Sequence, residues 1–220
     1  KILSSAPEHM PTVLMAGSVE LALGSPALAE PHLRKYVNAV PANVHARKLL
    51  ATALLKQGQS EEAQNMLASM MDDAKRSGKD DAQLLAIAGE VAMQERDYAK
   101  ASAYFEQASK LQPKAAALRT SLALSKLAQG DEAGAATDLE LSTTLDNDSS
   151  KAGVLLVLTE LRRKNYDKAL TAVKALETTQ PKDPMVQNLK GGVYLNLNDV
   201  PNARASFNQA LALQPTYFPA

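Results

Sequence analysis

The sequence contains no cysteine and no tryptophan, and only 4% of its residues are aromatic. Without cysteine the chain has no disulfide framework, no thiolate nucleophile and no thiolate metal site. The scarcity of aromatic rings argues against surfaces on which bases or sugars stack. Composition therefore removes thiol chemistry and weakens the case for nucleic-acid or glycan binding.

Charge of one sign and long hydrophobic runs are also missing. The 24 Lys and Arg residues balance 24 Asp and Glu residues, so no net field favours nucleic acid or an anionic membrane surface. Apolar runs such as 154–158 are far shorter than the roughly 20 residues that span a bilayer. We expect no nucleic-acid partner, no transmembrane segment and no secretory signal. The chain begins at Lys1, and a lipid anchor would lie outside these residues.

What the sequence does contain is a repeat. The segment 101–113 (ASAYFEQASKLQP) recurs at 203–215 (ARASFNQALALQP), 102 residues later, which is three times 34. Self-similarity at a fixed period decides the architecture. Ala63 and Ala101, however, are 38 residues apart, and we expect the four extra residues in a loop around 77–80. The 34-residue step otherwise links Ala29 with Ala63, and Ala101 with Ala135, Ala169 and Ala203.

Proline, glycine and apolar spacing predict two helices in each unit. Pro41, Pro113, Pro181 and Pro215 mark the ends of units, with Asn147 in the remaining place, because proline cannot continue a helix. Apolar residues recur at helical spacing within each unit, and short turns rich in Gly, Asp and Asn separate the two helices. Small residues at Gly17, Gly89 and Gly191 would let the helices approach, while a large residue fills the space between them. These predicted core residues are Leu33, Leu67, Phe105, Leu139, Val173 and Phe207.

This pattern of small, bulky and proline positions resembles the tetratricopeptide repeat (TPR). The resemblance implies an all-α, right-handed superhelix (an αα solenoid) of about six helix–turn–helix repeats. The expected divisions are the end of a preceding repeat (1–9), a single array (10–217, divided as 10–43, 44–77, 82–115, 116–149, 150–183 and 184–217) and the start of a further repeat (218–220). We therefore expect a fragment of a longer array. Two departures stand out, because Leu176 replaces a second-helix alanine and Lys190 stands where a leucine should be buried.

Candidate catalytic groups are few. His9, His32 and His45 lack metal-ligand spacing to one another, and paired acidic residues fall in loops or at helix starts, where they favour the helix N-terminus. We expect no catalytic residue, no cofactor and no metal ion, and hence no enzyme.

The remaining candidate is the inner wall of the solenoid, which first helices line. We interpret its middle as an aliphatic stripe that receives an extended peptide or an amphipathic helix of a protein partner. The alternative is that Leu124 and Leu158 are core between repeats. The predicted partner-binding groove comprises Lys48, Thr52, Lys56, Gln83, Glu90, Thr120, Leu124, Leu127, Leu158, Leu161, Arg162 and Asn188.

Several longer phrases carry a closer resemblance. In order and spacing, 85–113, 116–131, 155–184, 191–199 and 215–220 resemble the TPR-repeat lipoprotein of the exosortase/PEP-CTERM exopolysaccharide system. That resemblance implies the periplasm or outer membrane of the bacterial cell envelope, and a role in exopolysaccharide assembly or PEP-CTERM protein sorting. Two other hypotheses are a structural spacer and the non-catalytic arm of an enzyme such as a glycosyltransferase.

Overall fold

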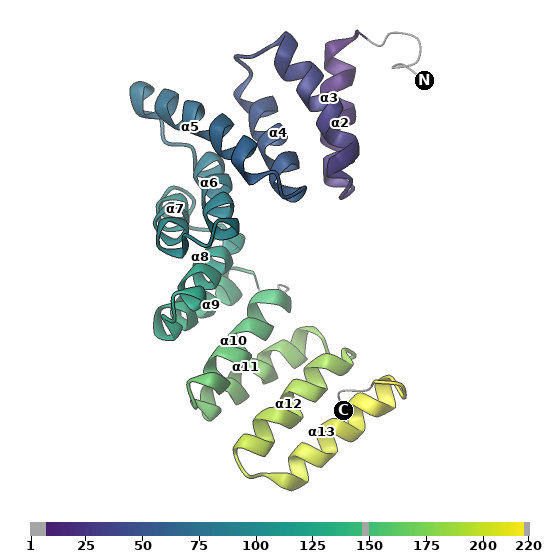
Figure 1. Cartoon of the computed structure of the whole chain (residues 1–220). Coiled ribbons are helices and arrows are strands. Elements are labelled where there is room, and N and C mark those ends of the chain that lie inside the picture. The colour runs from purple at the N-terminus through teal and green to yellow at the C-terminus, as the bar shows by residue number, and fades with distance from the viewer. Residues whose placement is uncertain (1–7, 147–149, 218–220) are drawn as a thin grey trace. The chain divides into compact units, whose positions relative to one another are not determined.

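The computed structural model describes residues 8–146 and 150–217, which contain twelve α-helices and no strand (Figure 1). The predicted all-α fold is confirmed. The chain forms two compact units, 1–112 and 113–220. Predictions for Ala6, Pro7, Asn147 and 218–220 lie outside the described residues.

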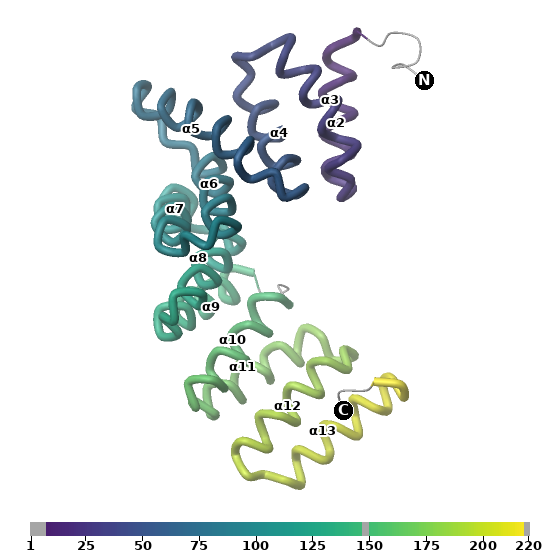
Figure 2. The backbone as a smooth tube through the Cα atoms, viewed as in Figure 1, coloured from purple at the N-terminus to yellow at the C-terminus, as the bar shows by residue number. Residues whose placement is uncertain are grey.

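Each unit consists of three antiparallel helical hairpins, and the first helix of each hairpin packs on the second (Figure 2). In unit 1 the hairpins are α2 (Met10–Ala22) with α3 (Pro26–Ala39), α4 (Val44–Lys56) with α5 (Ser60–Ser77), and α6 (Ala82–Gln94) with α7 (Tyr98–Leu111). In unit 2 they are α8 (Ala116–Ala128) with α9 (Glu132–Leu145), α10 (Ser150–Arg162) with α11 (Tyr166–Thr179), and α12 (Pro184–Asn196) with α13 (Val200–Leu213). We number repeat positions from the first residue of each first helix, and hairpins one to six in chain order.

Complementary side chains at repeat positions 8 and 24 close each hairpin. Gly89 stands opposite Phe105, and a Cβ atom added to this glycine would lie 2.6 Å from the phenyl ring. Gly191 stands opposite Phe207 in the same way, with 2.5 Å to its ring. The other pairs are Gly17 with Leu33, Ala51 with Leu67, Ala123 with Leu139, and Val157 with Val173. In five of the six hairpins a small residue thus stands opposite a large one, and in hairpin five two valines share the space.

Hairpin five adds a second exchange of sizes that sequence reasoning missed. Leu176 at position 27 is buried, and the chain accommodates it by placing Gly153 at position 4 of the facing helix. A Cβ atom on Gly153 would lie 2.8 Å from Leu176 Cδ1. Leu176 in place of the usual alanine therefore keeps the two helices of hairpin five packed, because Gly153 leaves room for it.

The turn inside each hairpin has one recurring backbone conformation. The backbone at position 15 is left-handed in all six hairpins. Glycine or asparagine, which adopt this conformation readily, stands there in four hairpins, and Arg96 and Lys164 stand there in the other two with φ of 61°. The next residue caps the second helix, and the side chains of Asp97, Asp131 and Asp199 accept hydrogen bonds from backbone N–H groups. The predicted short Gly/Asp/Asn turns follow from these two requirements.

The four extra residues of hairpin two do not form a loop. Helix α5 has 18 residues where the other second helices have 14, so the insertion adds about one helical turn. The register that places Pro41 and Pro113 at position 32 places Lys75 there, and α5 continues until the left-handed Gly78 ends it. The expected loop around 77–80 is wrong, because no proline stops the helix.

The cores of the two units differ. Among the described residues, unit 1 contains one cluster of 14 buried residues that runs from α2 to α6 and is dominated by leucine and alanine. The described residues of unit 2 contain two clusters of six, one around Leu139 and the other around Val173. None of the described helices is long and apolar enough to cross a membrane.

Candidate partner-binding surface

One of the two lysines predicted on the unit 1 surface is already paired. Lys48 Nζ, on α4, donates to Asp81 Oδ2 at 2.8 Å, and only 11% of the lysine side chain is exposed. Asp81 also caps α6 by accepting from the backbone N–H groups of Gln83 and Leu84. Burial raises the pKa of Asp81, but the hydrogen bonds that it accepts lower the pKa by more than burial raises it. The pKa of Asp81 therefore lies below its ordinary value. Lys48 therefore ties two hairpins together.

The other predicted residues of unit 1 are scattered over first helices. Thr52 is half-buried and its hydroxyl donates to the backbone oxygen of Lys48. Lys56, Gln83 and Glu90 are exposed. None of the three is among the residues that line the hollows described below, and all three are polar.

Unit 2 presents a hollow on its first helices. Leu127 and Ala128 of α8 face Leu155, Leu158, Thr159 and Arg162 of α10 across a volume of about 480 Å³. Leu158 is 46% exposed and lies on its wall, whereas Leu127 and Leu155 also pack on the core cluster beneath. The structure thus brings together three predicted residues, Leu127, Leu158 and Arg162.

Arg162 gives the hollow a charged rim. Its Nε lies 2.6 Å from Glu132 Oε1 at the start of α9, and more than half of its side chain is exposed. The pair is close to water and contributes at most about 1 kcal/mol. Its guanidinium keeps further N–H groups that can donate hydrogen bonds to an incoming carboxylate or backbone oxygen.

The prediction that Thr120 lies on the groove is wrong. The sequence places it on the groove, but it is only 6% exposed, and its hydroxyl lies 2.8 Å from that of Ser142 on α9. Ser142 also donates to the backbone oxygen of Ala116. A polar pair between helices holds Thr120 inside hairpin four, where it cannot contact a partner.

The remaining predicted residues of unit 2 lie at intermediate depth. Leu124 is half-buried, and Leu161 packs against the core cluster around Val173. Asn188 is half-buried, and its Oδ1 atom has no hydrogen-bond partner. Of the two residues that the core alternative concerned, Leu158 is 46% exposed and Leu124 is half-buried.

Lys190, expected to cost hairpin six some packing, has a partner instead. Its Nζ donates to Glu177 on α11 at 2.7 and 2.9 Å, and the fully buried Gln187 donates to the same carboxylate. Burial raises the pKa of Glu177, but the hydrogen bonds from Lys190 and Gln187 lower it below the ordinary value. A polar cluster joins hairpins five and six where a leucine would otherwise pack.

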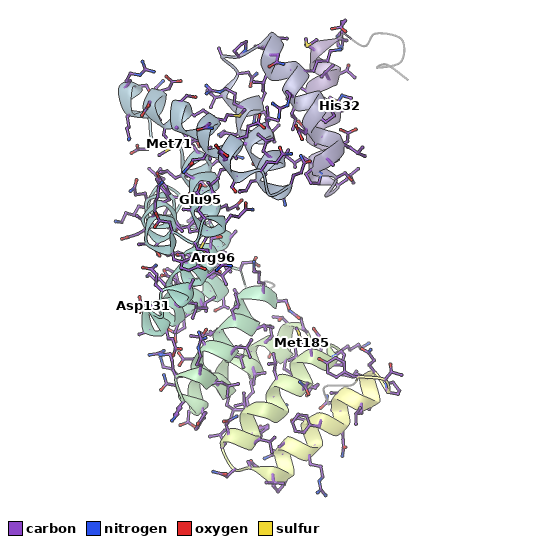
Figure 3. All side chains as sticks on the ribbon, in the orientation of Figure 1. His32, Met71, Glu95, Arg96, Asp131 and Met185 are labelled. Carbon is purple, nitrogen blue, oxygen red and sulfur yellow. The ribbon has the colours of Figure 1, made fainter. Side chains whose placement is uncertain are left out.

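Two further hollows lie between second helices and were not predicted. In unit 1, α5 and α7 flank α6 around about 400 Å³, with Met71 and Glu95 on the wall (Figure 3). In unit 2, α9 and α11 flank α10 around about 490 Å³, with Thr143 and Thr178 on its rim. Their shared place in the repeat indicates grooves between successive hairpins.

The histidines make local contacts. His9 Nδ1 lies 2.7 Å from the Thr12 hydroxyl, and His32 Nε2 lies 3.5 Å from Glu20. Among the residues that the structure describes, no group of three or more His, Asp or Glu side chains could hold a metal ion.

Comparison with protein families decides the classification. One tetratricopeptide repeat model matches residues 20–86, and a second matches 88–150 and 154–218. The chain belongs to the tetratricopeptide repeat family. This family is generally a non-catalytic fold whose members typically bind proteins or peptides. No curated protein matches the chain.

Solved structures support the same fold. A structure from the functional characterisation of PilF of Pseudomonas aeruginosa is 18% identical, with a TM-score of 0.75 over 98% of this chain and 96% of that one. A tetratricopeptide repeat protein from Parabacteroides merdae is 16% identical, with a TM-score of 0.66 over 92% and 79%. YrrB, described as a TPR protein with an unusual peptide-binding site, is 16% identical, with a TM-score of 0.68 over 85% and 94%.

Proposed function

We propose that this chain is a non-enzymatic scaffold that binds a segment of a partner protein in the hollow between α8 and α10. The observation that carries the proposal is the exposure of Leu158 on the wall of that hollow, beside Leu127 and Arg162. An apolar side chain of the partner would cover Leu158, and Arg162 would bind an oxygen of the partner's backbone or of an acidic side chain.

The family supports this proposal, because tetratricopeptide repeats typically bind protein or peptide partners. YrrB, which shares the fold, is described as having a peptide-binding site. Four of the six residues that line the hollow are apolar, and Thr159 and Arg162 supply its polar groups, which suits an aliphatic anchor residue beside a polar one.

For the cellular role, we propose exopolysaccharide assembly or PEP-CTERM protein sorting in the bacterial cell envelope. The support is the order and spacing of phrases such as 85–113 and 155–184, which resemble the lipoprotein of that system. Fractionation of the source bacterium tests the location: the protein should follow envelope markers, and recovery with cytoplasmic markers would contradict it.

The binding experiment uses Leu158→Glu. Partners are captured from detergent-solubilised envelope by the wild-type chain and by the variant, and identified by mass spectrometry. We expect a partner retained by the wild-type chain to be lost by the variant, because a charge on the wall opposes an apolar contact.

The matched control is Leu141→Glu on α9, since Leu141 is 38% exposed in the same unit but outside the hollow. Melting temperatures should be nearly unchanged for both variants. Equal capture by wild type, Leu158→Glu and Leu141→Glu would contradict the hollow as the binding site.

A further inference from the structure

The groove between α5 and α7 carries charged side chains of both signs. They line the hollow of about 400 Å³ over α6 and are all exposed: Asp72 and Lys75 on α5, Glu95 at the C-cap of α6, and Lys100 in the first turn of α7. Among the described residues, none of the four forms an ion pair, and only Glu95 has a side-chain hydrogen bond, which Gln64 donates at 3.2 Å. These charges are therefore available to a partner.

The fold does not require these charges. Glu95 is an anion at the C-terminal end of α6, and Lys100 is a cation in the first turn of α7, so each opposes the dipole of its helix. The corresponding hollow of unit 2 lies between α9 and α11, and the nine residues described on its wall include no charged one. Hydroxyl groups on its rim, such as those of Thr143 and Thr178, donate to backbone oxygens of their own helices. The same place in the repeat is thus charged in unit 1 and neutral in unit 2.

The space between these charges is apolar. On its floor lie Ala88, Val91 and Ala92 of α6, each at most 7% exposed. Met71 on α5 (Figure 3) and Tyr104 on α7 are half-buried on the two walls. Small side chains on the floor leave room above α6, and a flexible thioether and an aromatic ring adapt to aliphatic groups of different shape. The groove thus suits a row of aliphatic side chains.

The insertion in hairpin two lengthens one wall of this groove. It extends α5 to 18 residues, and residues of α5 line the groove from Gln64 to Lys75, over about three helical turns or roughly 16 Å. Lys75 stands at position 32, where Pro41 and Pro113 follow the ends of α3 and α7. A second helix of the usual length would place no helical side chain there. The extra turn therefore lengthens the groove and adds a cation to it.

The two lysines lie at opposite ends of the groove. Lys100 follows Glu95 across the turn between α6 and α7, and Glu95 contacts Gln64 near the start of α5. Lys75 lies 11 residues after Gln64, so about three helical turns separate the two cations along the groove. Asp72 lies one turn before Lys75 on the same wall. A partner segment with an acidic residue near each end therefore matches the lysines, and a basic residue near one end matches Asp72.

A helix fits this groove better than an extended segment does. The lining residues lie in helices or at a helix cap, where backbone groups are bonded mainly within the helix, so an extended segment would find few backbone partners. We propose that the groove between α5 and α7 binds an amphipathic helix of about three turns from a partner protein. Aliphatic residues on one face of that helix would pack on Val91, Met71 and Tyr104. An acidic residue near each end would pair with Lys75 or Lys100. This inference does not depend on the proposed hollow between α8 and α10.

The first test measures the affinity of the full chain for a synthetic helical peptide by fluorescence anisotropy. The peptide has about 14 residues, with leucine at every third or fourth position, a glutamate near each end of the leucine face, and a cross-link on its outer face that holds the helix. We expect the wild type to bind it and Ala68→Trp to weaken binding about tenfold or more, because exposed Ala68 lines the groove and an indole would fill the space for a leucine. Ala175→Trp is the matched control on the wall of the unit 2 hollow and should bind like the wild type.

Charge reversal tests the pairing at the two ends. The double variant Lys75→Glu with Lys100→Glu should bind the glutamate peptide about tenfold more weakly than the wild type does. It should bind a second peptide, with lysine in place of both glutamates, more tightly than the wild type does, and this recovery separates lost pairing from lost folding. The proposal would be overturned by a wild type that fails to bind the glutamate peptide or prefers the lysine peptide, or by equal binding to Ala68→Trp.

Discussion

The two units use the same hairpin but fill it differently. Unit 1 has one continuous apolar cluster, and its ion pairs lie at the edges, as with Arg34 between Glu30 and Glu62. Unit 2 has two small clusters, with polar groups at the centre of each hairpin. Asp138 is 4% exposed, and Glu160 and Gln187 are fully buried. The same hairpin can therefore be filled by apolar side chains or by paired polar groups. Where polar groups are buried, as in unit 2, the apolar core consists of two separate clusters.

This contrast predicts different consequences for the same deletion. Leu54→Ala in α4 and Leu139→Ala in α9 both empty fully buried sites, and each should cost about 2–5 kcal/mol of unfolding free energy. Because the unit 1 core is continuous, Leu54→Ala should speed hydrogen exchange from α2 to α6. Leu139→Ala should speed it in α8 to α10 and leave α12 and α13 protected. Equal spreading of the loss through both units would contradict the contrast.

The polar centre of hairpin four should be sensitive to loss of its carboxylate. Asp138 lies 3.0 Å from Arg119 Nη1 and 2.6 Å from Lys126 Nζ. Asp138→Ala would leave both cations without their partner and should cost about 1–3 kcal/mol. Chemical denaturation measures the change. Glu140→Gln is the control, because this exposed residue pairs with a single cation, Lys168, among the described residues. A loss as large as that of Asp138→Ala would contradict the role of burial.

One glycine in each unit faces a phenylalanine, which allows the two units to be compared directly. Gly89→Ala and Gly191→Ala place a Cβ atom equally close to a phenyl ring, but Phe105 is buried and Phe207 is half-buried. We expect Gly89→Ala to destabilise the chain by about 1–3 kcal/mol, since the ring cannot move. Gly191→Ala should cost less, because Phe207 can shift toward solvent. Thermal unfolding compares the two, and a larger loss for Gly191→Ala would contradict this interpretation.

Acid should weaken unit 1 more than unit 2, because more of its carboxylates have a lowered pKa. Hydrogen bonds from Arg34 lower the pKa of Glu62, and those from Arg34 and Gln57 lower the pKa of Glu30. A carboxylate whose pKa is lowered by folding contributes stability above its ordinary value of 4.5, and that contribution is lost as pH falls through the lowered pKa. Three such groups lie in unit 1 (Glu30, Glu62 and Asp81) and one in unit 2 (Glu177), among the described residues.

The double variant Glu30→Gln with Glu62→Gln tests this dependence. It should be less stable than the wild type at neutral pH and should lose less stability than the wild type between pH about 5 and 3. Urea denaturation at a series of pH values gives both quantities. Parallel pH profiles for the two proteins would show that these carboxylates do not carry the acid sensitivity.

Most of the fold follows from the register. Once the 34-residue step is recognised, positions 8, 20 and 24 must face the partner helix, and the six alanines at position 20 are all at most 1% exposed. The error at α5 had a visible signal, because Lys75 stands at the proline position and Gly78 follows. Helix ends depend on such single residues, which makes them harder to place than the helices themselves.

The candidate surface was harder to predict from the sequence than the fold. The assignment of Thr120 failed because a hydroxyl looks solvent-exposed until its partner on the other helix, Ser142, is known. Lys48 looked like a free cation because Asp81 lies 33 residues away. Polar side chains pair with residues on other helices, and this pairing depends on contacts that helical spacing does not encode.

The pair of Gly153 and Leu176 has a consequence for how such a gene can change. Each residue suits the other, so exchanging the first or the second helix of hairpin five alone for that of another repeat would set a Cβ atom against Leu176 or leave a void beside Gly153. Unequal crossing-over between repeats would therefore yield folded products when the breakpoints lie between hairpins. Breakpoints inside the turn 163–165 would yield unstable ones.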